Sequence, residues 1–340
     1  MIHVLGIETS CDDSCVAVIN DKYQVLSNVV SSQTEFHRRF GGIVPEVASR
    51  KHLEYLPLVL DQALRDAHLD LENIDLVAVT QGPGLLGSLL MGVCLAKTIA
   101  LFKDKTFLGV NHLEGHLFAI RLEYPEIQPP FLALIVSGGH TEIIAVRDWG
   151  KYRHLGSTRD DAAGEAYDKV SKFLNLGYPG GPIIDRLSEG AQGDRFHFSA
   201  GLEDDDTLDF SFSGLKTAVV RHYSSLKEEE KKDEKLIRDL VASFQESVAR
   251  VLVNKTFKAL KIYGFSQIVV GGGVAANRHL RAKMKEEGEK RGVQVFFPSP
   301  SFCTDNGAMI AACGLFHWER GRKDSWEMDP DPRLPLTSIE

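Results

Sequence analysis

The stretch HVLGIETSCDDSCVAVI at residues 3–19 decides the fold, because two short apolar runs flank a turn of acids and small polar residues. Apolar runs of this length on either side of a polar turn are typical of a β-hairpin. The stretch FLALIVSGGHTEIIAV at residues 131–146 repeats the arrangement in the second half of the chain. The sequence therefore predicts two hairpins of the same kind, each opening one half of a duplicated structure.

The same order of elements follows each hairpin. In the first half the expected strands are His3–Ile7, Val16–Ile19, Val25–Val30, Leu76–Thr80 and Phe107–Val110, and the helices are Val47–Leu69 and Leu85–Phe102. In the second half the strands are Phe131–Val136, Glu142–Val146, Tyr152–Ser157, Gln267–Val270 and Val293–Phe297, and the helices are Ala163–Leu174, Ile184–Glu189, Leu236–Tyr263, one after Gly273 and one near Asp305–Glu319. This pattern predicts an α/β fold of two lobes, each a mixed sheet with helices on its faces.

We expect the N-terminal lobe to span residues 1–110 and to be completed by the C-terminal helix near residues 305–325. The second lobe would then span residues 111–304. A charged insertion at about residues 194–235 interrupts it, carrying Asp204–Asp206 and Lys227–Lys235. Charge runs of this kind are typical of a solvated loop or helix surface.

Composition excludes several classes of protein. The 340 residues include 39 Lys plus Arg and 47 Asp plus Glu, and the net charge of −8 excludes a non-specific nucleic-acid coat. Five cysteines, without a CxxC pair, indicate a reducing, cytoplasmic setting. The N-terminus lacks a signal-peptide pattern, and Leu85–Phe102 holds Ser88, Gly92 and Lys97, which favours a buried helix over a membrane span.

Glycine gathers where strands are expected to end, at residues 82–87, 137–140, 178–182 and 271–273. Residues without a Cβ let backbone N–H groups approach an anion, and a following helix adds its positive end. Gly271, Gly272 and Gly273 would lie against an adenine or ribose, with Asn277 donating hydrogen bonds. The turn lacks the Lys-Ser/Thr ending of a P-loop and the glycine spacing of a Rossmann fingerprint, which argues against both of these nucleotide-binding classes. We therefore expect a nucleotide-binding cleft between the lobes.

The segment His112-Leu113-Glu114-Gly115-His116 places two histidines four residues apart, on one face of a helix, as a shared metal ion requires. Glu114 follows the first histidine by two positions, about 200° around the helix, which excludes the metallopeptidase signature. Asp305 is the candidate third ligand. An aspartate that opens a helix is also a common N-cap, and the sequence leaves both roles open.

Further polar residues lie where the expected strands and helices begin or end. Glu8, Ser10 and Asp12 would form a hairpin that faces phosphate or metal, whereas Cys11 and Cys15 are better explained as buried apolar residues. Asp160 and Asp161 are expected to cap the helix that begins at Ala163. Asp168, a turn further on, is the better candidate to bind a ligand hydroxyl.

Ten ordered motifs between residue 6 and about residue 315 resemble the TsaD family of tRNA threonylcarbamoyladenosine transferases, once described as glycoproteases. They are GIETSCDDS (6–14), GGIVPEVASRKH (41–52), QGPGLLGSL (81–89), NHLEGH (111–116), VSGGHTEI (136–143), DDAAGEAYDKV (160–170), YPGGP (178–182), FSFSGLKTA (210–218), GGGVAANR (271–278) and CTDNGAMI (303–310). The duplicated lobes also resemble the superfamily of actin, the heat-shock ATPases and the sugar kinases. No motif residue departs from the family pattern.

The resemblance implies an acyltransferase that moves a threonylcarbamoyl group from threonylcarbamoyl-AMP to the exocyclic amine of adenosine 37, releasing AMP. The tRNAs are those that read codons beginning with A. It implies one divalent metal ion, usually iron and sometimes zinc, on His112, His116 and Asp305, with magnesium as a companion of the nucleotide. It implies partners, the paralogue TsaB and the ATPase TsaE. The adenylate would contact Val136, Ser137, Gly138, Gly139, His140, Asp168, Gly181, Asp185 and Asn277.

A chain of charge −8 must bind tRNA through a local basic patch. The densest candidates are Arg38, Arg39, Arg50 and Lys51. These charges are equally well explained as residues that keep a helix surface soluble. Two other functions remain open from the residues alone. An ATPase or phosphotransferase of the same superfamily would share the cleft but would not need His112 and His116, and a non-catalytic scaffold would need neither them nor the glycine loops.

Overall fold

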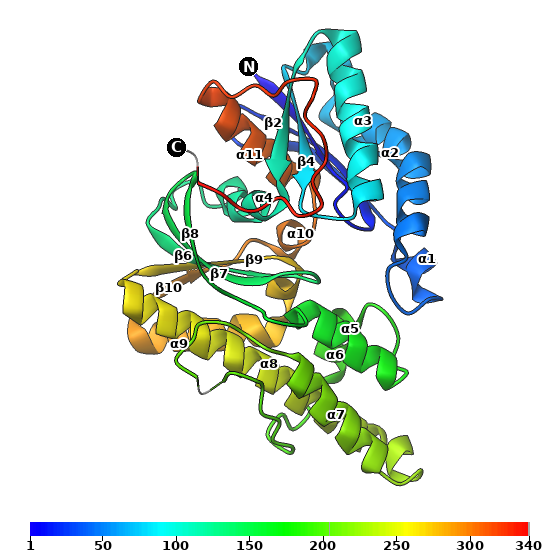
Figure 1. Cartoon of the computed structure of the whole chain (residues 1–340), viewed down its shortest axis with the longest axis vertical. Helices are drawn as coiled ribbons and strands as arrows, with labels where there is room; N and C mark the ends of the chain where they lie inside the picture. Colours follow the sequence, from blue (N-terminus) through cyan, green and yellow to red (C-terminus); the bar gives the residue numbers. More distant parts are fainter. Residues whose placement is uncertain (204, 339–340) are drawn as a thin grey trace. The chain divides into compact units, whose positions relative to one another are not determined.

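The computed structural model describes residues 1–203 and 205–338, and the chain divides into two compact units (Figure 1). The first unit combines Met1–Ile127 with Thr304–Thr337, and the second is built on Gln128–Cys303. Each unit holds a five-stranded sheet with helices, as the sequence predicts for an α/β fold of two lobes.

The first unit is organised around a mixed sheet in the order β3-β2-β1-β4-β5. The hairpin of β1 and β2 is antiparallel, with Ile7 opposite Val16, and β4 and β5 run parallel to β1. Every residue of β1 beyond His3 is buried. The strands are β1 (His3–Glu8), β2 (Asp13–Asn20), β3 (Val25–Ser32), β4 (Leu76–Gly82) and β5 (Thr106–Asn111).

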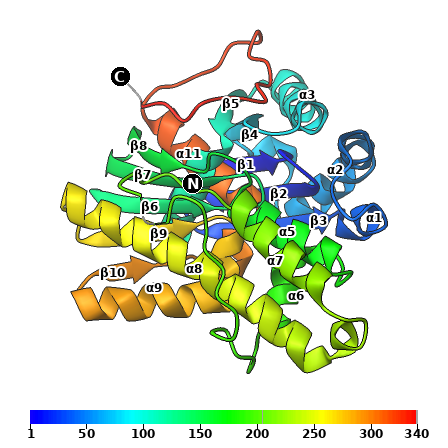
Figure 2. The same ribbon diagram turned by 60° about the horizontal axis from the view of Figure 1, so that its bottom comes forward.

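Helices cover both faces of this sheet (Figures 1 and 2). The helices α2 (Pro45–Ala67) and α3 (Leu86–Lys103) lie side by side on one face and α11 (Gly307–Glu319) lies on the other. The shorter helices are α1 (Thr34–Arg38) and α4 (His112–Phe118). By length and composition α3 is apolar enough to cross a membrane, but one of its faces is buried in the core of this unit, as expected for a core helix.

The second unit repeats the first sheet. Its order is β10-β9-β6-β7-β8, so that β6, β7 and β8 form an antiparallel meander and β9 and β10 add parallel strands beyond β6. The duplication predicted from the hairpins is present in the topology. The strands are β6 (Phe131–Val136), β7 (Thr141–Asp148), β8 (Lys151–Ser157), β9 (Gln267–Gly271) and β10 (Gln294–Phe296).

The 30-residue helix α8 (Glu234–Tyr263) is the centre of the second core, where Phe244, Val248 and Leu252 are fully buried. It lies beside α9 over one face of the sheet (Figures 1 and 2). The remaining helices of this unit are α5 (Ala163–Phe173), α6 (Gly180–Leu187), α7 (Ser213–Ser225), α9 (Arg278–Arg291) and α10 (Pro300–Cys303).

The first unit extends to Ile127, beyond the expected boundary at residue 110, because α4 packs on α11. The rings of Phe118 and Phe316 lie 4.9 Å apart, and a Cβ on Gly115 would lie 2.8 Å from Ile310. The paired histidines therefore belong to the same unit as Asp305, which the expected division had separated.

The insertion at residues 194–235 is more than a charged surface. Phe210 and Phe212 are fully buried, and α7, which was not expected, begins directly after them. Asp160 accepts hydrogen bonds from the backbone N–H groups of Phe212 and Ser213 instead of capping α5. Asp161 likewise pairs with Lys169 and Lys216, so the expected capping role was wrong for both aspartates. Of Asp204–Asp206, the first residue lies outside the described residues.

The contact between β1 and α11 gives a first prediction. A Cβ on Gly6 would lie 2.1 Å from the carbonyl oxygen of Gly307 and 2.7 Å from the Ala311 nitrogen, both backbone atoms. We expect Gly6→Ala to destabilise the protein by at least about 1–3 kcal/mol, as overpacked cores do. Thermal unfolding measures this. Gly214→Ala in α7 is the matched control, because a Cβ there meets nothing within 4 Å, and it should leave the melting temperature unchanged or slightly raised. Equal melting temperatures would contradict the packing argument.

Candidate functional site

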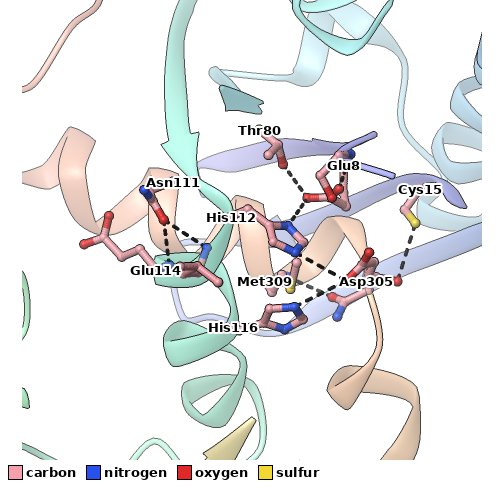
Figure 3. A network of polar contacts seen from close by, with 12 residues as sticks. Glu8, Cys15, Thr80, Asn111, His112, Glu114, His116, Asp305 and Met309 are labelled. Atoms are coloured by element: carbon pink, nitrogen blue, oxygen red, sulfur yellow. Dashed lines mark hydrogen bonds and ion pairs between the residues drawn. The ribbon is translucent and has the colours of Figure 1, made fainter. Parts of the chain in front are cut away.

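Three candidate ligands of the first unit converge (Figure 3). His112 and His116 occupy the first two turns of α4, and their ring centroids lie 4.7 Å apart. The Asp305 Oδ1 atom is 3.6 Å from His112 Nε2 and 3.3 Å from His116 Nε2. These three donor atoms lie close enough together to bind one metal ion, as the sequence predicted.

The neighbouring Asn306 decides between the two roles left open for Asp305. Asn306 is the N-cap of α11, and its Oδ1 accepts a hydrogen bond of 2.9 Å from the backbone N–H of Met309. Because capping is done by this amide, the carboxylate of Asp305 faces the two histidines instead (Figure 3).

Glu8, at the end of β1, orients the first histidine. Its Oε2 lies 3.0 Å from His112 Nδ1 and also accepts a hydrogen bond from the Thr80 hydroxyl. A carboxylate on Nδ1 fixes the tautomer and leaves Nε2 available for a metal ion. Burial alone would lower the pKa of His112, but Glu8 and Asp305 raise it to about 9. His112 in turn holds the pKa of Glu8 below its ordinary value, against the effect of burial.

The surroundings of His116 show whether these three residues suit a metal ion. Its side chain is fully buried, and neither ring nitrogen makes a hydrogen bond within the described part of the chain. A buried imidazole without a hydrogen bond is costly unless another ligand satisfies it. A metal ion on Nε2, shared with His112 and Asp305, would remove that cost. The residues present therefore fit a divalent ion.

Asn111 is a positioning residue that sequence reasoning missed. Its Oδ1 accepts hydrogen bonds from the backbone N–H groups of Leu113 and Glu114, and so caps the helix that carries both histidines. Its Nδ2 donates to the carbonyl oxygens of Leu334 and Pro335, each at 3.2 Å. An asparagine directly before a helix is a recognisable N-cap signal, but the partners from the far end of the chain are not readable.

In the second unit, the glycine loops meet at the carboxyl ends of β6 and β9. Gly272 has φ +90, and a Cβ there would lie 2.4 Å from the carbonyl oxygen of Val136. A Cβ on Gly164 of α5 would lie 2.6 Å from the carbonyl oxygen of Ser137. By contrast, Gly138, which follows β6, faces open space. Gly272 therefore serves close backbone packing.

The other residues expected to hold the adenylate belong to these loops or to α5, α6 and the N-cap of α9: Ser137, Gly139, His140, Asp168, Gly181, Asp185, Gly271, Gly273 and Asn277. Asp168 Oδ1 accepts a hydrogen bond of 2.7 Å from the Gly180 N–H, and burial raises the pKa of this carboxyl to about 6. Asp185 pairs with Arg278 at 2.8 Å. Asn277 caps α9 and donates to Gln245, so both ends of its amide are engaged within the protein.

The sequence profile of the TsaD family, described as tRNA N6-adenosine threonylcarbamoyltransferase, matches residues 24–312. The chain belongs to the TsaD family. A tRNA N6-adenosine threonylcarbamoyltransferase of Crocosphaera subtropica is 50% identical over 345 residues, covering 100% of this chain and 99% of the relative. One of Clostridium perfringens is 47% identical over 334 residues, covering 98% of each chain.

Solved structures support the fold of this TsaD family member. The crystal structure of T. kodakarensis HypF aligns with a TM-score of 0.61 at 14% identity, over 94% of this chain and 48% of that chain. Component A of (R)-2-hydroxyglutaryl-CoA dehydratase from Acidaminococcus fermentans aligns with a TM-score of 0.54 at 14% identity, over 93% and 99%. At such identities the likeness concerns the fold alone.

The hairpin residues next to the candidate metal ligands of this TsaD family member have different roles. Ser10 is buried, its N–H bonds to Glu8 and its carbonyl accepts from Leu85. The Asp12 carbonyl accepts from Gln33, which ties the hairpin to the segment before α1. Of the three hairpin residues expected to face phosphate or metal, Glu8 contacts the candidate metal ligand His112 directly.

The basic residues expected to contact tRNA lie in or beside α1 and α2: Arg38, Arg39, Arg50 and Lys51. Arg38 and Lys51 each pair with a glutamate on their own helix, at 3.1 and 2.6 Å. Lys51 Nζ also lies 4.4 Å from the centre of the Phe36 ring. Arg39 and Arg50 are exposed and make no ion pair among the described residues, so they are the better positions at which to test a tRNA contact.

The raised pKa of His112 predicts how metal binding depends on pH. The metal-free imidazole is protonated up to about pH 9, and a metal ion must displace that proton. Metal affinity should therefore rise about tenfold per pH unit between roughly pH 7 and 9 and level off above. Isothermal titration calorimetry across this range measures it. Glu8→Gln should weaken binding about 10–100-fold and flatten the pH dependence. A pH-independent affinity in the unaltered chain would contradict the assignment.

Proposed function

We propose that this chain transfers the threonylcarbamoyl group from threonylcarbamoyl-AMP to N6 of adenosine 37 in tRNAs that read codons beginning with A. The proposal rests on family membership across residues 24–312 together with the complete His112, His116 and Asp305 ligand set. In the reaction, the adenosine amine forms a C–N bond to the carbamoyl carbon and loses a proton. The bond from that carbon to the phosphate oxygen breaks, and AMP leaves.

The activated substrate decides what the protein has to supply. A carbamoyl adenylate carries its own leaving group, so the main tasks are to orient an amine against the carbonyl and to stabilise developing charge. A nucleophilic serine or cysteine is unnecessary. A bound divalent ion would supply positive charge at the carbonyl or phosphate. We favour iron(II), with zinc as the alternative, because two histidines and one carboxylate suit iron(II). Magnesium would accompany the nucleotide.

The glycine loops of the second unit are the proposed adenylate site. Backbone N–H groups at Gly138 and Gly139 can approach phosphate because no side chain stands in the way. Gly181, in the first turn of α6, also faces open space. The Asp168 carboxylate, already bonded to the Gly180 N–H, is placed to accept a ribose hydroxyl beside that turn.

The tRNA presents its adenosine from the anticodon loop, where an unstacked base can enter a pocket without melting a duplex. We propose cytoplasmic TsaB and TsaE as partners. The surface that suits the paralogue TsaB is the apolar stripe of α2 and α3, where Leu53, Leu86 and Leu90 are 68%, 55% and 41% exposed. Exposed leucines on neighbouring helices are typical of a protein interface.

The proposed reaction is tested directly by product analysis. The metal-loaded chain is incubated with threonylcarbamoyl-AMP and unmodified tRNA, with and without TsaB and TsaE, and the nucleosides are identified by mass spectrometry. We expect threonylcarbamoyladenosine at position 37 and release of AMP. His116→Ala should lose metal and product while its circular dichroism is retained, because a catalytic ion contributes little to folding. His154→Ala, at a half-exposed histidine paired with Glu142, is the control. Full turnover by His116→Ala would refute the role of the metal ion.

The proposed adenylate site gives a prediction about ligand binding. Gly181→Val should weaken binding of a non-hydrolysable threonylcarbamoyl-AMP analogue without lowering the melting temperature or the metal content, because the new side chain meets only open space in the free protein. Gly272→Val should instead destabilise the fold, since its Cβ would overlap the Val136 backbone. Calorimetry and thermal unfolding separate the two effects. Unchanged affinity in Gly181→Val would place the adenylate elsewhere.

A further prediction concerns the binding of tRNA. Reversing Arg39 and Arg50 together to glutamate should weaken tRNA binding and lower the slope of log affinity against log salt by about 1–2, as loss of two phosphate contacts requires. Affinity for the adenylate analogue should not change. The control reverses Lys290 and Arg291 on α9, which changes the net charge equally. If both double variants bind tRNA alike, the arginines are not contacts.

A further inference from the structure

A second cluster of metal-type donors lies on the other face of the helix that carries the histidines. Glu114 of α4 and Cys313 and His317 of α11 are all buried, at 5%, 0% and 4% exposure. The Glu114 Oε2 and His317 Nε2 atoms are 2.8 Å apart, and the three donor atoms lie within 4.8 Å of one another. None of these residues has a part in the proposed transfer reaction.

The cluster is separate from the first centre because of the helical repeat. Glu114 lies between His112 and His116 in sequence but about 200° around the helix from His112. Its side chain accordingly points away from the two imidazoles (Figure 3). Cys313 and His317 are four residues apart on α11 and so share one helix face, the spacing with which a helix offers two ligands to one ion.

We propose that Glu114, Cys313 and His317 form a second metal site, of the zinc class, in this chain. One thiolate, one imidazole and one carboxylate are the ligand types that Zn²⁺ accepts, with bonds of about 2.0–2.3 Å. Donors around one tetrahedral ion lie roughly 3–4 Å apart, so the three side chains need to close by only about 1 Å. Magnesium and calcium are excluded as the preferred occupant, since both require oxygen ligands.

The electrostatic surroundings permit a cation at this place. Arg322 acts electrostatically on Cys313, and its guanidinium pairs with Asp324 at 3.1 Å. Two ligands that become anionic, a carboxylate and a thiolate, would neutralise the charge of a divalent ion in the buried site. The Cys313 thiol also hydrogen-bonds to Glu114, so this carboxylate contacts both other donors of the cluster.

The position of the site gives it a structural role. It would join α4 to α11, and these helices adjoin all three ligands of the first centre: His112 and His116 are part of α4, and Asp305 lies two residues before α11. An ion held from both helices would restrict their relative movement. Loading the second site should therefore raise the melting temperature and leave the chemistry of the first centre unchanged.

Cobalt(II) is the probe that separates the two sites. Both sites take it, but only the second offers a thiolate, and therefore only the second gives a thiolate-to-cobalt charge-transfer band in the near ultraviolet. The metal-free full chain is titrated with cobalt(II) chloride while absorbance and bound cobalt are measured. We expect two cobalt ions per chain and the charge-transfer band, with a higher melting temperature after the second ion binds.

Variants assign the band to its ligands. Cys313→Ser, nearly equal in volume, and Glu114→Gln, which keeps a hydrogen bond to His317, should each bind one cobalt ion. Cys313→Ser should lose the band entirely. Cys94→Ser removes an exposed thiol and should keep it, and His116→Ala should lose the other ion but keep the band. One ion without a band in the unaltered chain, or a band that survives Cys313→Ser, would overturn the proposal independently of any transferase assay.

Discussion

The close approach of α11 to the backbone of β1 is the constraint on which the first unit depends. Gly6 and Gly307 meet where any side chain would overlap main-chain atoms, so the helix lies directly on the sheet. That contact brings Asp305, from the far end of the chain, beside the histidines of α4. The convergence of these three candidate ligands is thus a consequence of backbone packing, and the glycines that permit it lie outside the ligand set.

The centre also shows how burial and charge oppose each other. Removing His112 from water lowers its pKa, yet Glu8 and Asp305 outweigh that effect and raise it to about 9. A largely buried cluster of two carboxylates and two imidazoles is costly unless the charges compensate. The same balance would favour a cation in place of the proton. The nearby Asp13 carboxyl, buried beside Asp12, has its pKa raised to about 7, so the hairpin contributes less negative charge than its composition suggests.

The local patterns were sufficient to predict two mixed sheets and the order of their strands along the chain, because each strand and helix carries its own periodicity. The pair His112 and His116 was equally readable from its spacing. The choice for Asp305 was not, since it depends on Asn306 taking the cap. The boundary at residue 110 was wrong because only the packing of Phe118 on Phe316 assigns α4 to the first unit. The burial of Phe210 and Phe212 was hidden by the charges around them. The unit boundary depends on a partner distant in sequence, whereas the role of Asp305 depends on which of two neighbouring residues caps α11.

The first unit is interrupted in sequence, and this has a consequence for how the chain is made. Residues 1–127 emerge from the ribosome long before residues 304–337, which cover the second face of their sheet and supply Asp305. Residues 128–303 emerge in between as one uninterrupted core. Until α11 has been synthesised, one apolar face of the nascent N-terminal sheet is uncovered, and such a state is prone to aggregation. The second unit can therefore fold before the first is complete, and His112, His116 and Asp305 can come together only after residue 305 has been synthesised.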